Sequence, residues 1–97
     1  MIIHIVLFKL RDQSPANVAQ TRGVLLSMTG KIPQLRHLEV GEDLIHSERS
    51  YDLALVTKFD SLDDLRAYQI HPYHAGQVLP HTQKVSSSVV TVDYESK

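Results

Sequence analysis

The sequence has no cysteine and no tryptophan among its 97 residues. The absence of cysteine excludes a disulfide framework, a thiolate nucleophile and a cysteine-based zinc or iron–sulfur site. An excess of one charge is also lacking, because ten basic side chains stand against eleven acidic ones and leave a net charge of −1. Lys and Arg are scattered rather than clustered, which argues against a nucleic-acid partner.

Long hydrophobic runs and glycine-rich loops are missing as well. No apolar stretch approaches the ~18 residues that a transmembrane helix requires, and residues 1–9 lack the basic start and the cleavage site of a signal peptide. The four glycines are isolated from one another, so there is no phosphate-binding loop. We therefore expect a cytoplasmic globular protein, one domain over residues 1–97, with neither a membrane nor a nucleic-acid partner.

Four segments have the composition of β-strands. In three of them β-branched and other apolar side chains are concentrated, whereas the fourth alternates only loosely. In chain order the predicted strands cover residues 2–9, 35–41, 51–59 and 89–94.

Two helices are predicted between these strands. The first is capped by Ser14, has Pro15 at its first position and stops at Gly30. The second begins after Ser61 and ends at Pro72. Its predicted buried face carries Leu62, Leu65 and Tyr68. A further short helical piece over residues 73–79 is expected to be broken by Pro80.

The order β-α-β-β-α-β predicts a ferredoxin-like α+β fold. Two helices can cover only one face of a four-stranded sheet, yet the strands carry apolar side chains on both faces, such as Ile5 opposite Val6. The uncovered face would be an unusually large apolar patch for a monomer. We therefore expect a homodimer in which two sheets pack face to face.

Proton-transfer chemistry is concentrated in one segment. His71, Tyr73 and His74 surround Pro72, and Tyr68 lies within about two helical turns of them. Imidazoles and phenols donate and accept protons near neutral pH, so a catalytic site is expected here if the protein has one.

The chain resembles the stress-responsive α/β-barrel domain family from end to end. The resemblance rests on the first strand, on Lys31-Ile32-Pro33 after the first helix and on the segment that leads into the third strand. Its most specific part is the second helix with its proline. These segments read IHIVLFK at residues 3–9, SERSYDLALV at 47–56 and FDSLDDLRAYQIHPYH at 59–74. The resemblance implies a dimeric ferredoxin-like α/β barrel with its helices outside, and a member of unassigned activity.

One plant polyketide cyclase belongs to the same family. Its likeness implies that Tyr68 and His74 are catalytic, with His74 as general base and Tyr68 as partner of the developing oxyanion. It also implies a small-molecule pocket between sheet and helices, in which His4, His71 and Leu53 contact the ligand. Leu53 stands where the cyclase has a further pocket histidine. Because of this departure, the resemblance does not extend to the substrate of the cyclase, although it still allows proton-transfer chemistry.

Other interpretations remain open for these residues. Tyr68 has the spacing of a core aromatic, His71 the position of a helix-capping imidazole, and His4 the setting of a hydrogen-bonded strand residue. His4, His71 and His74 would give at most three imidazole ligands for a metal ion. Pro72 breaks the helix that would place His71 and His74 on one face, and we expect neither metal nor cofactor. A cofactor-independent cyclase, lyase or isomerase, a ligand-binding protein and a structural module are the three functions considered.

Overall fold

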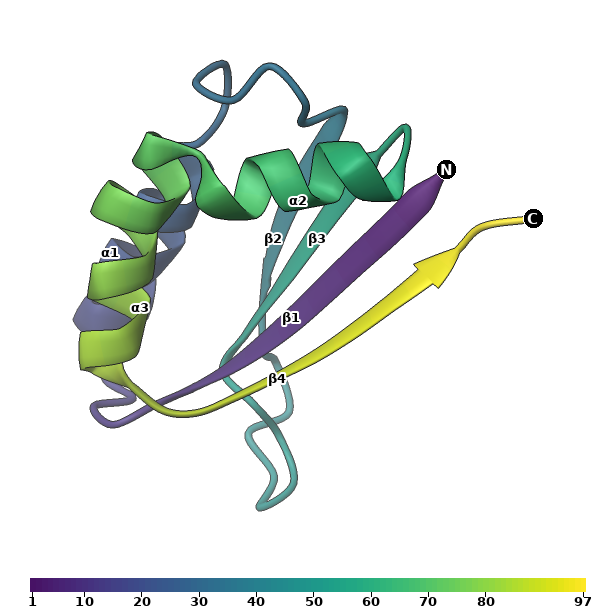
Figure 1. Ribbon diagram of the computed structural model, residues 1–97. Coiled ribbons are helices and arrows are strands. Elements are labelled where there is room, and N and C mark those ends of the chain that lie inside the picture. Colours follow the sequence, from purple (N-terminus) through teal and green to yellow (C-terminus); the bar gives the residue numbers. More distant parts are fainter.

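A computed structural model describes residues 1–97. Its elements follow the order β1 (Ile2–Leu10), α1 (Pro15–Leu26), β2 (His37–Glu42), β3 (Leu53–Phe59), α2 (Leu62–Ile70), η1 (His74–Val78), α3 (Leu79–Val85) and β4 (Ser86–Glu95). All helices lie on one face of a single sheet, and the two chain ends emerge at the same end of it (Figure 1). The expected ferredoxin-like α+β fold is confirmed.

The sheet has the strand order β2-β3-β1-β4, and every pair is antiparallel. Its two central strands, β1 and β3, are paired from Ile2 opposite Phe59 to Phe8 opposite Leu53. Because side chains alternate between faces along a strand, the even-numbered residues of β1 point toward the helices. The odd-numbered residues point toward the uncovered face.

Both predicted N-caps are confirmed by their hydrogen bonds. The Ser14 hydroxyl accepts from the Asn17 N–H at 3.3 Å, and the Ser61 hydroxyl accepts from the Asp64 N–H at 3.1 Å. Each bond satisfies one of the amide donors that a helix start leaves unpaired. His71 ends α2, as expected from the proline that follows it.

The helical prediction after Pro72 was wrong at Pro80. The chain does not break there, because the π-helical turn η1 passes directly into α3 and Pro80 lies in the first turn of α3. A proline in the first turn is tolerated, since that amide has no partner within its own helix. The prediction for Leu62 was also wrong, because this side chain is 51% exposed at the start of α2.

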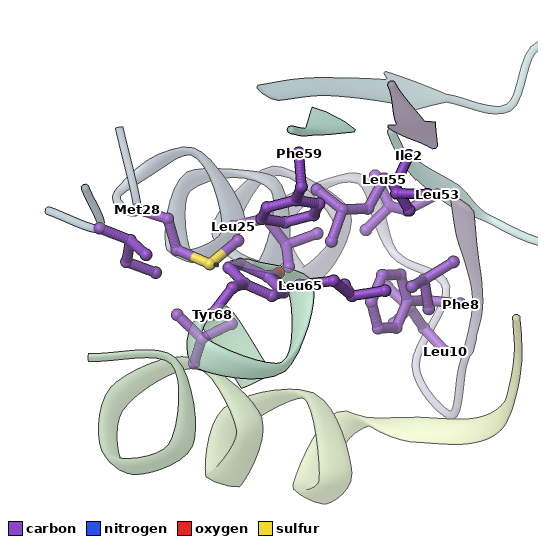
Figure 2. Close-up of a cluster of buried hydrophobic side chains, with 13 residues drawn as sticks. Ile2, Phe8, Leu10, Leu25, Met28, Leu53, Leu55, Phe59, Leu65 and Tyr68 are labelled. Atoms are coloured by element: carbon purple, nitrogen blue, oxygen red, sulfur yellow. Dashed lines mark hydrogen bonds between the residues drawn. The ribbon is translucent and has the colours of Figure 1, made fainter. Parts of the chain in front are cut away.

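The core lies between the sheet and the helices. Tyr68, Phe59, Leu25 and Met28 are fully buried, and Figure 2 shows them packed together in the middle of the cluster. Burial of large apolar side chains of this kind is the main stabilising contribution in a domain of this size. The core position that the spacing predicted for Tyr68 is thus confirmed.

The uncovered sheet face is apolar, as the alternation predicted. Its exposed side chains on β4 include Val90, Val92 and Tyr94, which are 43%, 54% and 48% exposed. Ile5 and Leu7 of β1 lie opposite Val92 and Val90 in the same sheet. The face therefore presents a contiguous row of hydrophobic side chains to its surroundings.

No helix of the structure has the length and apolar composition needed to cross a bilayer.

Candidate functional site

A cavity of about 320 Å³ lies between the helix-facing side of the sheet and the helices. Its floor is formed by β1, β3 and β4, and its roof by α2, η1 and α3, with Leu25 of α1 closing one side. Eight of its fourteen lining residues are hydrophobic. A concave, mostly apolar site with a few polar groups is the usual form of a small-molecule pocket.

Three of the predicted site residues meet in this cavity. His4, Tyr68 and His74 all line it, although they come from β1, α2 and η1. The Tyr68 ring lies 4.6 Å from the His74 ring and 6.1 Å from the His4 ring, measured between centroids. The fold therefore brings the histidine of the first strand close to the tyrosine and histidine of the segment around Pro72.

His74 is held by a backbone carbonyl. Its Nδ1 atom lies 3.0 Å from the carbonyl oxygen of Gln69, which can only accept a hydrogen bond, so Nδ1 carries the proton. Nε2 is then the ring nitrogen that can accept a proton. Burial lowers the pKa of His74 below its ordinary value, and the nearby His4 and His71 add to this effect against the opposing carbonyl bond.

The residue that makes this contact is also the first residue of a π-helical turn. His71 leaves the helical conformation before Pro72, and the chain resumes with five residues, His74–Val78, in a wider turn. Such turns are rare and frequently occur at functional sites. Here the wider turn begins at His74, the residue whose ring bonds the last turn of α2.

Tyr68 presents a phenol that stays protonated. Its side chain is fully buried, and burial raises its pKa well above the ordinary range for tyrosine. The hydroxyl donates to the sulfur of Met28 at 3.7 Å. A thioether is a weak acceptor, so a carbonyl oxygen in the cavity would compete well for this donor.

Asp93 is the site residue that sequence reasoning missed. Its carboxylate accepts a hydrogen bond from Nδ1 of His4, the residue directly opposite it across the β1–β4 pair. The carboxylate therefore fixes the orientation of the His4 ring and leaves Nε2 for a ligand. The available signal was the single acidic residue of the strand predicted over residues 89–94, on the same face as Val89 and Thr91.

Two predicted ligand contacts do not line the cavity. Leu53 is buried under the other end of β3, opposite Phe8, and the cavity wall on that strand is Leu55. The Nδ1 atom of His71 accepts a hydrogen bond from the Tyr73 N–H at 3.1 Å. His71 thus stabilises the chain reversal at Pro72 instead of facing a ligand.

No group of three or more His, Asp or Glu side chains is arranged to hold a metal ion. His4, His71 and His74, the three imidazoles considered from the sequence, do not form such a group.

Comparison with known proteins places the chain in a family. The model of the Stress responsive A/B Barrel Domain matches residues 2–96. An uncharacterised protein of Streptomyces coelicolor is 32% identical over 99 residues, which cover 98% of this chain and 99% of that protein. The chain belongs to the stress-responsive A/B barrel domain family.

Solved structures agree with this assignment. A dimeric ferredoxin-like protein of unknown function from Bacteroides fragilis is 33% identical, covers 98% of this chain and 95% of its own, and has a TM-score of 0.83. The hydroxynitrile lyase from Passiflora edulis is 17% identical, covers 96% of this chain and 90% of its own, and has a TM-score of 0.82. At that identity the lyase shares the fold alone.

Proposed function

We propose that this protein binds a small carbonyl compound in the cavity and removes a proton from the carbon next to the carbonyl group, with His74 as general base. One observation carries the proposal. The Gln69 carbonyl holds the proton of His74 on Nδ1, while burial lowers the pKa of the ring, so Nε2 is an unprotonated base at neutral pH. A base of this kind typically contributes a factor of about 10² to 10⁴ in rate.

The proton step is balanced by groups of this chain. The C–H bond breaks, its proton moves to Nε2 of His74, and its electron pair forms the enolate. The Tyr68 hydroxyl donates a hydrogen bond to the enolate oxygen in place of its present weak bond to the Met28 sulfur. Return of the proton to carbon completes an exchange or isomerisation, and attack of the enolate on a second carbonyl would give a cyclase.

Deuterium incorporation into simple ketones tests this function without knowledge of the natural substrate. Butanone and heptyl methyl ketone are incubated with the protein in D₂O, and loss of the α-proton signals is followed by NMR. Wild type should accelerate exchange, and His74→Ala should abolish the acceleration. His37→Ala is the matched control, because His37 lies on β2 next to Glu39 and outside the cavity.

Equal exchange by His74→Ala and wild type would overturn the role of His74. Absence of any acceleration across the ketones would overturn the enzymatic proposal as a whole.

A second candidate is binding without chemistry, and the cavity itself favours it. A ligand that binds the folded state raises its stability by mass action. Thermal stabilisation by the ketones with no deuterium incorporation would support this candidate over the enzyme. The cavity argues against a third function, a purely structural module. In such a module we expect side chains to fill the space around His4, Tyr68 and His74.

We further propose that the working form is a homodimer joined through the uncovered sheet face. The exposed Val90, Val92 and Tyr94 support this assembly, as does the dimeric relative from Bacteroides fragilis. Native mass spectrometry of the purified protein tests it, since a monomer at micromolar concentration would contradict the proposal. The cytoplasmic location expected from the sequence stays a prediction, to be checked by cell fractionation.

A further inference from the structure

The lining of the cavity has no residue of fixed charge. None of its fourteen residues is Lys, Arg, Asp or Glu. His74 is neutral near pH 7, because burial lowers its pKa. His4 is bonded to the Asp93 carboxylate, so any positive charge on its ring is balanced. A carboxylate or phosphate would enter this cavity without a partner charge, which is costly in an apolar site.

The cavity floor follows β1 from His4 to Phe8. The helix-facing residues His4, Val6 and Phe8 form a line in its floor, beside Thr91 and Val89 of β4. Phe8 follows His4 by four positions along the strand, which corresponds to about 13 Å. A volume of about 320 Å³ holds roughly ten non-hydrogen atoms at the ~30 Å³ that a water molecule occupies in the liquid.

The two ends of this space differ in chemistry. At the His4 end the imidazoles and the Tyr68 phenol are gathered within a few ångströms of one another. The other end lies under α3, because α3 passes directly into β4 at Ser86, which pairs with Leu10. There the floor consists of Phe8 and Val89, and Gln83 is an exposed, uncharged residue of the rim.

We propose that the ligand is an uncharged, unbranched carbonyl compound of about ten non-hydrogen atoms. Its carbonyl group lies at His4, Tyr68 and His74, and its apolar tail runs along β1 to Phe8 and Val89. This inference rests on the proposed function, to which it adds the charge and the length of the ligand. Anionic and cationic chains of equal length should bind more weakly, because the lining has no residue of fixed charge and the Asp93 carboxylate beside it is already bonded to His4.

Calorimetric titration with three chains of the same carbon number tests the charge. Heptyl methyl ketone should bind the wild-type protein at least about tenfold more tightly than nonanoate or nonylamine, because only the ketone enters without an unpaired charge. Affinity for either ion equal to that for the ketone would overturn the inference.

Substitution at the far end tests the length. Val89→Trp should fill the space beside Phe8 and weaken binding of heptyl methyl ketone at least about tenfold, since the buried methylenes of the tail lose their site. Butanone is too short to reach Val89 from the His4 end, so its binding should weaken much less, and the ratio of the two affinities is the readout. Val89 is 47% exposed, so the larger ring can be accommodated in the folded chain. Leu44→Trp, in a loop residue that is 86% exposed, is the control.

A charge introduced at the far end should admit an anion. Gln83→Lys places an ammonium group at the rim and should tighten nonanoate binding about fivefold. Gln83→Met, which has similar length and no charge, should leave nonanoate binding weak. No gain with Gln83→Lys would overturn the assignment of this end of the cavity.

The results separate this inference from the proposed function. Tight, length-dependent ketone binding without deuterium exchange would overturn the general base and support the ligand class. Exchange catalysed equally well on ketones of every length, with Val89→Trp unchanged, would overturn the ligand class and leave the base in place.

Discussion

The imidazole of His74 lies against the phenol ring of Tyr68, with the two ring planes tilted by 39°. Their contact joins a residue of the π-helical turn to a fully buried residue of α2. The Tyr68 hydroxyl donates to Met28 and not to His74, so the two His74 nitrogens bond elsewhere. One of them bonds Gln69, and the other is the proposed base.

The titration of His74 should couple to stability. Burial lowers its pKa in the folded chain, whereas the unfolded chain titrates near the ordinary value of 6.5. As the pH falls below that value the unfolded state takes up a proton that the folded state resists, so the free energy of unfolding decreases. Urea unfolding between pH 8 and pH 5 should show this decrease in wild type.

His74→Gln should make the decrease smaller, because it removes this proton from the balance. An NMR titration of the ring should give a midpoint below 6.5 in the folded protein. A midpoint above that value would contradict the effect of burial described here.

Removal of the Tyr68 hydroxyl should affect activity much more than stability. Tyr68→Phe should change the free energy of unfolding by less than about 1 kcal/mol, since the lost bond is a weak one to sulfur. If the phenol serves the enolate oxygen, the same variant should lose most of the deuterium exchange. Urea unfolding and NMR exchange on one preparation measure both.

Tyr68→Ala is the comparison for packing. Removal of a fully buried aromatic ring should cost about 3–5 kcal/mol. A similar loss of stability in Tyr68→Phe would mean that the hydroxyl is a structural group.

Two neighbouring residues of β4 test the proposed dimer. Val92→Lys puts a charge in the middle of the uncovered apolar face and should shift the protein to monomers. Thr91→Lys is the matched control, because its side chain points into the cavity on the opposite face. Size-exclusion chromatography with light scattering should find a dimer for Thr91→Lys. A dimer for Val92→Lys as well would move the interface elsewhere.

Gly23 offers a stabilising substitution. It lies inside α1, and a Cβ atom added there would meet nothing within 4 Å. Gly23→Ala should therefore raise the free energy of unfolding by about 0.5–1 kcal/mol through helix propensity alone. Thermal and urea unfolding measure the gain, and an unchanged or lower stability would contradict the argument from helix propensity.

Local signals were sufficient to predict most of the fold. Ser14 and Ser61 act within a few residues of themselves, so their caps could be read directly from the sequence. The alternation along β1 likewise fixed which side chains share a face. Pro80 was misjudged because proline breaks a helix interior but fits a first turn, and the π-helical turn that placed it there leaves no sequence pattern.

The site was less predictable because it depends on pairing between distant segments. The family resemblance named His4, Tyr68 and His74, and the cavity contains all three. Asp93 becomes visible only when β4 is placed beside β1 in register. Leu53 and Leu55 face the same side of β3, and only the position of the helices decides that Leu55 borders the cavity and Leu53 does not.

β1 and β4 each serve two surfaces with alternate side chains. Val6 and Thr91 face the cavity, while Ile5 and Val92, one position along, belong to the face proposed for the dimer. Any change in strand twist on filling the cavity must reach the opposite face through the same backbone. Thermodynamic linkage then requires the two effects to be equal. If the bound ligand changes the dimerisation affinity by some factor, dimerisation changes the ligand affinity by the same factor.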